Sequence, residues 1–198
     1  MRNVSRVALA VVTAIMAAGF GGPALAQAPS EADMQRGKAF MQKSMTMMTP
    51  ELLEKAKALP PEIQQFLLRI AIKHKLHSDT LTLTQVMQEV LADYLAVGAA
   101  IASDNGELAA DAARRIANHR LPRGGMLPYL PLDKVNGEDL SVLPAMEQVV
   151  EGGAMKLAEA AESGDMAAAA RHYGDITSGC VACHVHFRGQ PGISPNLK

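Results

Sequence analysis

Five residues near the C-terminus have types and spacing that suit one particular chemistry: Cys180, Val181, Ala182, Cys183 and His184. This is the C-x-x-C-H pattern of covalent c-type haem attachment. Two thiols at this spacing add across the two vinyl groups of one haem, and the histidine that follows supplies an imidazole to the iron. The chain has only two cysteines, and both lie in this motif. We therefore predict one haem c, with thioethers at Cys180 and Cys183 and with His184 as the proximal axial ligand.

Two other uses of a C-x-x-C pair compete with haem attachment. In an oxidising compartment the thiols can form a redox-active disulfide, but that motif is typical of a βαβ unit, and the sequence shows no strand-like alternation. A structural zinc site needs four ligands. His186 would add one, but there is no second cysteine pair. Haem attachment is the interpretation that the motif favours.

The segment 1–26 has the three parts of a secretory signal peptide. Arg2 and Arg6 are positive, residues 7–20 are mostly apolar, and residues 24–26 (Ala-Leu-Ala) form a small-x-small cleavage site. The apolar run of about 14 residues is shorter than the roughly 20 that a spanning helix needs, so cleavage after Ala26 is favoured. We predict an exported chain that begins at Gln27. Its expected location is the bacterial periplasm.

The charge balance gives no indication of a nucleic-acid partner. Loss of Arg2 and Arg6 would take the formal net charge from −1 to −3 (−1 minus 2), whereas nucleic-acid-binding domains are clearly basic. No segment after the signal has the length and apolarity of a membrane span. We predict an exported chain that binds neither nucleic acid nor, once the signal is removed, a membrane.

Helical periodicity recurs along the chain, so we predict an all-α protein. The last helix is the clearest, because Ser163-Gly164-Asp165 forms a stop-and-start signal before it and Gly189 and Pro191 end it. The haem motif belongs to its apolar stripe and is therefore expected on the inner face. That stripe consists of Met166, Ala169, Tyr173, Ile176, Cys180, Cys183, His184 and Phe187.

Three helices are predicted upstream of the last one. They cover about residues 83–103, 107–119 and 137–163. Gly152 and Gly153 within the third allow a close approach of the haem or of another helix, or else reflect simple packing of small residues. With the last helix these elements predict a haem-binding four-helix bundle over residues 80–190. An N-terminal helical extension (27–79) would precede the bundle, and a tail (191–198) would follow it.

The position of the motif adds a family resemblance. In the commonest small c-type cytochromes the motif lies near the N-terminus, whereas here it lies on the last predicted helix. Together with residues 179–188, GCVACHVHFR, this resembles the cytochrome c′ group, class II of the c-type cytochromes. The resemblance covers residues 80–188 and implies a mono-haem protein that forms a homodimer. It also implies that Arg188 contacts a haem propionate; the alternative is a solvated cation at a helix C-terminus.

Two branches of this group differ at the second axial position of the iron. In one, an apolar residue of the first helix covers a five-coordinate iron that binds nitric oxide or carbon monoxide. In the other, a methionine of that helix ligates the iron, and the protein carries electrons. Met87 is the candidate distal ligand, with a core methionine as the alternative. If residues 30–48 supply the first helix instead, Met41 or Met45 would ligate the iron or Phe40 would cover it.

The leading hypothesis is a periplasmic mono-haem c-type cytochrome that passes single electrons to a redox partner protein. No catalytic acid, base or nucleophile constellation is visible, so we do not expect an enzyme. A gas-binding haem protein is the second hypothesis, and a helical protein with a Cys180–Cys183 disulfide is the third. His74 and His77 are expected at a solvated basic helix end; the alternatives are a surface metal pair or a distal haem ligand. His119 is expected at another helix end.

Overall fold

The computed structural model describes residues 28–188, and every element named within that range is a helix. The prediction of an all-α protein is confirmed. Within the same range, no helix combines the length and apolarity needed to cross a bilayer. The predicted signal peptide and the predicted tail at 191–198 lie outside the described residues.

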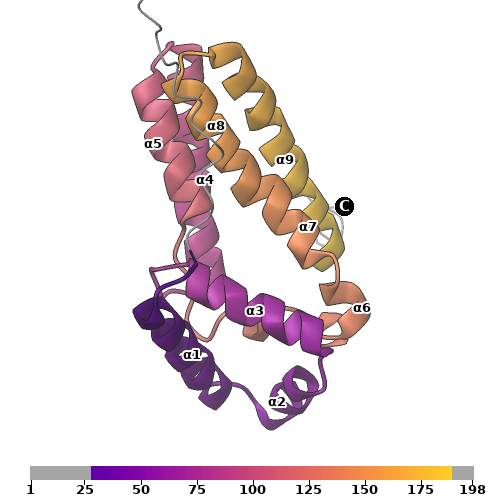
Figure 1. Cartoon of the computed structure of the whole chain (residues 1–198). Coiled ribbons are helices and arrows are strands. Elements are labelled where there is room, and N and C mark those ends of the chain that lie inside the picture. Colours follow the sequence, from indigo (N-terminus) through magenta and orange to yellow (C-terminus); the bar gives the residue numbers. More distant parts are fainter. Residues whose placement is uncertain (1–27, 189–198) are drawn as a thin grey trace, which may run out of the picture.

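Four long helices lie side by side in the upper part of Figure 1. They are α4 (Leu83–Ala102), α5 (Gly106–Ala117), α8 (Gly153–Glu162) and α9 (Met166–Arg188). α5 packs between α4 and α8, α8 packs against α9, and α9 also contacts α4. The core between them combines many alanines with a few large buried side chains, among them Val97, Ile116, Leu157 and Ile176. Small side chains at the contacts let helix axes approach closely.

The turns that join these helices form as the sequence predicts. Asn105 caps α5, and between α8 and α9 Gly164 adopts a φ of 80° while Asp165 accepts the backbone N–H of Ala168. At the same end, a Cβ on Gly106 would lie only 2.6 Å from a backbone oxygen of α8. Glycine is therefore required there because the two turns touch.

The helix predicted over residues 137–163 is divided in the structure. α6 (Gly137–Leu140) is a single turn, and α7 (Leu143–Glu147) continues through a π-helical segment, Gln148–Gly152, into α8. Pro144 lies in the first turn of α7. Backbone N–H groups in the first turn have no acceptor within the helix, so the missing N–H of proline costs no helical hydrogen bond. A Cβ on Gly153 would lie 3.2 Å from Ile176, so this glycine allows a neighbouring helix, α9, to approach.

The N-terminal segment forms a second group of helices in the lower part of Figure 1. α1 (Glu31–Thr46) packs against α3 (Pro61–Lys73), and α2 (Pro50–Lys57) lies between them in the chain. Two short 3-10 helices, Leu127–Tyr129 and Leu132–Lys134, interrupt the loop after α5. A second core joins these parts to the end of α9; its largest members include Leu52, Ile63, Phe66, Leu140 and Phe187.

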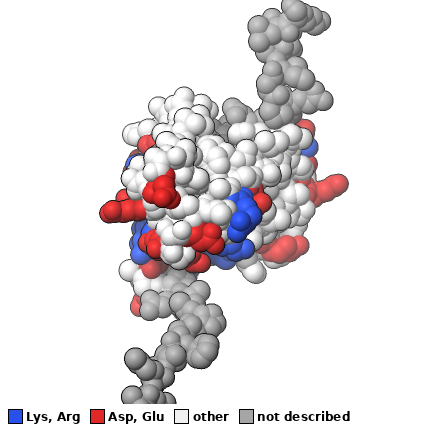
Figure 2. All heavy atoms as spheres, turned by 90° about the horizontal axis from the view of Figure 1, so that it is seen from above, with Lys and Arg blue, Asp and Glu red and all other residues white. Residues whose placement is uncertain are grey.

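Charged side chains of both signs are mixed on the end of the molecule that carries the two tight turns. Figure 2, which views that end from above, shows blue and red groups interspersed. Elsewhere ion pairs link neighbouring helices, such as Arg115 of α5 with Asp93 of α4 at 2.7 Å and Arg114 of α5 with Glu162 of α8 at 2.5 Å. Exposed pairs of this kind contribute little to stability, so the cores must hold the helices together.

The core between the four long helices yields a stability prediction. Leu157 of α8 has no exposed surface, so Leu157→Ala should leave a cavity and lower the free energy of unfolding by about 2–5 kcal/mol. Leu108→Ala, at a position that is 42% exposed, is the control and should change it by less than about 1 kcal/mol. Urea unfolding followed by circular dichroism measures both. Equal losses in the two variants would contradict this assignment of the core.

Candidate haem-attachment site

The C-x-x-C-H motif lies in the C-terminal half of α9, and its three functional side chains are half-buried. Two hydrophobic cores meet at this point. Cys180 packs against the core of the four long helices, and Cys183 packs against the second core beneath the N-terminal helices. Because residues three and four apart share a face of a helix, Cys180, Cys183 and His184 lie on one side of α9.

A close helix contact sets the position of the motif along α9. A Cβ on Gly179 would lie 2.8 Å from side-chain carbons of both Val149 and Val150. The π-helical segment therefore lies directly against α9 one residue before Cys180. Beyond the motif, the His186 ring bonds the backbone oxygen of Asp139 at 3.1 Å, and Phe187 is buried. The motif is thus held on both sides along the helix.

α4 contacts α9 through aromatic side chains. The rings of Tyr94 and Tyr173 stack with centroids 4.3 Å apart, and the Tyr94 hydroxyl bonds the Thr177 hydroxyl. A side chain on Gly98 would meet the Tyr173 hydroxyl at 2.7 Å. Tyr173 therefore lies between Tyr94 and Gly98, and later residues of α4 meet earlier residues of α9. The two helices are antiparallel.

This contact places Met87 and His184 at the same level. Met87 lies seven residues before Tyr94, and His184 lies seven residues after Thr177. At a rise of 1.5 Å per residue, each lies about 10 Å along its helix from the contact between Tyr94 and Thr177. Because the helices are antiparallel, both displacements run toward the same end of the molecule. Seven residues are close to two turns, so Met87 shares the helix face of Tyr94 and His184 that of Thr177. Toward this end α4 and α9 diverge in Figure 1.

Apolar side chains are unusually exposed on α4 and α9 near this level. Leu91 and Leu95 of α4 and Val181 and Val185 of α9 each expose more than half of their surface. Large exposed apolar groups that cluster together commonly mark a surface that another group covers. Val181 lies between the two cysteines and Val185 directly follows His184, whereas Leu91 and Leu95 lie within one turn of Tyr94 on α4.

The alternative distal groups lie on a different helix. α1 packs against α3, whereas α4 packs along α9. Phe40 is buried and stacks on His77 with ring centroids 4.1 Å apart. Met41 packs against the same small cluster, and Met45 is 38% exposed. Phe40 and Met41 therefore belong to a cluster that contains neither Cys180 nor Cys183. Arg188 ends α9, and its side chain lies outside the described residues.

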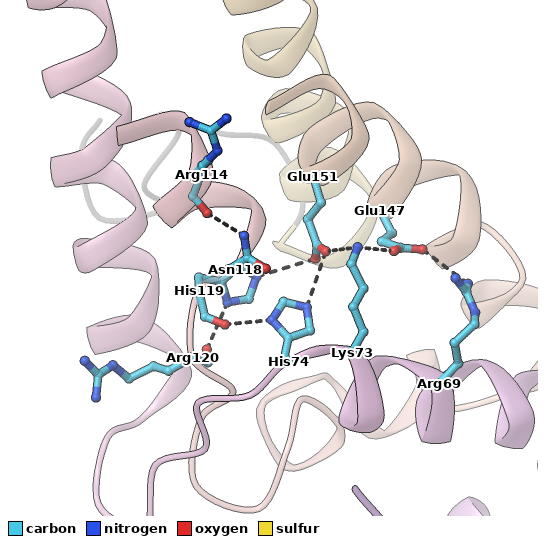
Figure 3. Close-up of polar contacts among 9 residues, drawn as sticks. All are labelled: Arg69, Lys73, His74, Arg114, Asn118, His119, Arg120, Glu147 and Glu151. Carbon is cyan, nitrogen blue, oxygen red and sulfur yellow. Dashed lines mark hydrogen bonds and ion pairs between the residues drawn. The ribbon is translucent and has the colours of Figure 1, made fainter. Parts of the chain in front are cut away.

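The expectation that His74 lies at a solvated helix end is wrong. Its side chain is only 1% exposed, and its Nδ1 donates to the backbone oxygen of His119 at 2.7 Å. The two rings are 4.7 Å apart, and both lie beside the carboxylate of Glu151 (Figure 3). His77 is half-buried, and burial lowers its pKa.

The carboxylate of Glu151 is the centre of this buried group. Lys73, the last residue of α3, joins it to Glu147, with Nζ 2.6 Å from an oxygen of each. Burial alone would raise the pKa of Glu151, but His119, His74 and Lys73 outweigh burial and lower it well below its usual range. No periodicity in the sequence connects these residues. The only sequence signal was the His74/His77 pair on a basic stretch, and it pointed to the surface.

Comparison of the chain with protein-family models, with curated proteins and with solved structures gives no match. The function therefore rests on the motif and on the arrangement of the residues around it.

Proposed function

We propose that this protein is a periplasmic mono-haem c-type cytochrome that transfers single electrons to and from a redox partner protein. Cys180 and Cys183 would hold the haem, and His184 would ligate its iron. One observation carries the proposal: a complete C-x-x-C-H motif lies on one face of α9, where Cys180 packs against one hydrophobic core and Cys183 against the other. The proposed haem-binding unit is a four-helix bundle of α4, α5, α8 and α9, as the cytochrome c′ resemblance implies.

The residues present fit a haem. The donor set comprises two thiols and an imidazole on one side of a helix, which matches the chemistry of thioether attachment and axial ligation. Two apolar side chains of the motif region are also open to a macrocycle: Val181, between the cysteines, and Val185, directly after His184, are each 51% exposed. A large apolar ring system would cover such side chains and remove them from water.

When bound, the haem supplies a one-electron Fe(III)/Fe(II) couple. The protein's part is to hold the axial ligands still and to set the polarity around them. The contact of Gly179 with the π-helical segment and the stacking of Tyr94 on Tyr173 fix α9 against two neighbours. A rigid frame keeps structural change between the oxidation states small, and thioether ligation by Met87 would raise the potential.

The position of the cysteines argues against a redox-active disulfide. Reactive dithiols lie at helix N-termini or beside cations, where the thiol pKa is lowered. Cys180 instead lies several turns beyond Met166, the first residue of α9. Burial raises the pKa of its thiol. Both features favour a thiol that is modified once, during haem attachment, over a thiol that cycles between the reduced form and a disulfide.

A second candidate function is a five-coordinate haem that binds nitric oxide or carbon monoxide. One observation favours it: Val90 and Leu91, one turn from Met87, are apolar, and Val90 packs against the same core as Cys180. If Met87 does not ligate, these residues would cover the iron without occupying its sixth position. The spin state of the iron separates the two functions.

An absorption spectrum of the purified exported protein tests the proposal. We expect one covalent haem per chain from the pyridine haemochrome, and a low-spin ferrous spectrum that does not change when carbon monoxide is added. A high-spin ferrous spectrum that shifts with the gas would favour the second function. Protein secreted by a strain competent for haem attachment that carries no haem would refute both.

A further inference from the structure

We propose that His74, His119 and Glu151 form a site for one divalent transition-metal ion of the zinc class, separate from the haem motif. Figure 3 shows the three side chains converging from different parts of the chain. One nitrogen or oxygen atom from each lies within 4.8 Å of the others. Two imidazoles and one carboxylate are a common ligand set for zinc. The site depends on neither the haem nor the proposed electron transfer.

The backbone holds the two histidines in place. The segment after α3 and the segment after α5 are joined by hydrogen bonds: the N–H of Leu121 donates to Leu76 at 2.9 Å, and that of Ser78 donates to Leu121 at 2.9 Å. These bonds fix His74 and His119 side by side. Glu151 comes from the π-helical segment that precedes α8. Such segments recur at functional sites because the extra residue turns a side chain out of the regular helical order.

Hydrogen bonds fix which ring nitrogens face the carboxylate. The Nδ1 atom of His74 lies 2.7 Å from the backbone oxygen of His119, and Nδ1 of His119 lies 2.9 Å from that of Arg120. A carbonyl oxygen only accepts, so each Nδ1 carries a proton and donates it. In the neutral ring, Nε2 then has a free lone pair. Metal-bound histidines are oriented in the same way, with the other ring nitrogen donating to a carbonyl or a carboxylate.

Both Nε2 atoms face the carboxylate of Glu151. Nε2 of His74 lies 3.3 Å from one oxygen of Glu151, and Nε2 of His119 lies 3.6 Å from the other. Nε2 of His74 is buried and makes no hydrogen bond. Donor atoms about 2.0–2.1 Å from a tetrahedral zinc ion are about 3.3 Å apart, and the two histidine–carboxylate separations are close to this value.

The charge around the site is balanced without the histidines. Glu147 and Glu151 carry two negative charges, and Lys73 and Arg69 pair with them at 2.6–3.2 Å. Lys73 hydrogen-bonds the carboxylate of Glu151 and orients it, as a residue outside the ligand set would do. The carboxylate oxygens keep further lone pairs that can bind an ion. Three protein ligands leave a fourth position for water. His119, whose side chain is 20% exposed, is the most exposed of the three ligands.

Zinc titration of the purified haem-loaded protein tests the site. After treatment with a chelator and dialysis, isothermal titration calorimetry with zinc chloride at pH 7 should give one ion per chain. Zinc measured against haem iron should then give a ratio of one. Zinc should also raise the thermal midpoint, and EDTA should reverse the rise, because the ion binds the folded chain preferentially. X-ray absorption should show imidazole nitrogen and carboxylate oxygen at about 2.0–2.2 Å from the zinc.

Variants assign the ion to these residues. His119→Gln and Glu151→Gln should each weaken binding by about 100-fold or more, given that outer partners of such ligands alone are worth about 10–100-fold. His172→Gln is the matched control, since that histidine pairs with Asp175 on α9, and it should bind zinc as the wild type does. If Glu151→Gln fails to fold, His119→Gln carries the test, because His119 is the most exposed ligand.

Two outcomes would overturn the site. One is wild-type protein that binds no zinc, which would indicate a purely ionic cluster. The other is binding that survives in both ligand variants. If the protein contains no haem, the same titration is done after alkylation of Cys180 and Cys183, so that zinc at the thiols is not counted. Zinc binding and haem content are therefore measured separately, so that failure of one proposal can be told from failure of the other.

Discussion

Replacing Cys180 and Cys183 together by alanine should remove all covalently bound haem from the protein. The two residues are the only cysteines of the chain, so no other thiol can form a thioether. Haem staining after denaturing electrophoresis gives the answer directly, because only covalent haem stays with the chain. We expect a stained band for the wild type and none for the double variant.

The controls separate lost attachment from lost folding. Val181→Ala changes an exposed residue between the two cysteines and should keep full staining. The double variant should retain its helical circular dichroism, because both thiols are only half-buried and alanine suits a helix. A stained band at the mass of the double variant would refute the assignment of the motif.

Local signals account for the parts of the fold that could be predicted. α9 was expected from Asp165 to the residues before Gly189, and it covers Met166–Arg188. The turn before it and the turn before α5 were also predicted correctly, because capping side chains and a left-handed glycine act within a few residues. The C-x-x-C-H motif is visible in the sequence for the same reason, because it lies within five consecutive residues; the haem remains a prediction.

The division of the helix over residues 137–163 was not predicted. Its apolar stripe is continuous through Leu140, Leu143 and Met146, so periodicity alone favours one helix. The break after Leu140 and the π-helical segment before Gly153 depend on packing against other helices. Val149 and Val150 lie against Gly179 of α9, and a contact between two different helices leaves no periodic signal in the sequence of either.

The cluster of His74, His119 and Glu151 was missed for a similar reason. Each residue alone suggests a solvated helix end or a surface acid, which is the common fate of such residues. They meet because the segments after α3 and α5 pair through their backbones at His77 and Leu121. Sequence patterns specify that short bridge poorly, so burial of His74 became apparent only in the structure.

Substituting Met87 by leucine should convert the iron from low-spin to high-spin and open it to carbon monoxide. Leucine has nearly the same volume as methionine, so the change should cost less than about 1.5 kcal/mol of stability. It removes the thioether sulfur that Met87 would present to the iron, at the level of His184 on α9. Loss of a thioether ligand should also lower the reduction potential. Absorption spectra with and without the gas, and a redox titration, measure these effects.

Met146→Leu is the matched control for Met87→Leu. Met146 is also half-buried, and it packs against the same core as Cys183, so it is a methionine of similar environment near the motif. It belongs to α7, however, and not to the helix that faces His184 along the line set by Tyr94 and Tyr173. We expect its spectrum to stay low-spin. If the Met146 variant changes and the Met87 variant does not, the distal ligand comes from α7. If the wild type is already high-spin and Met87→Leu leaves it so, Met87 is a core residue and the gas-binding function takes precedence.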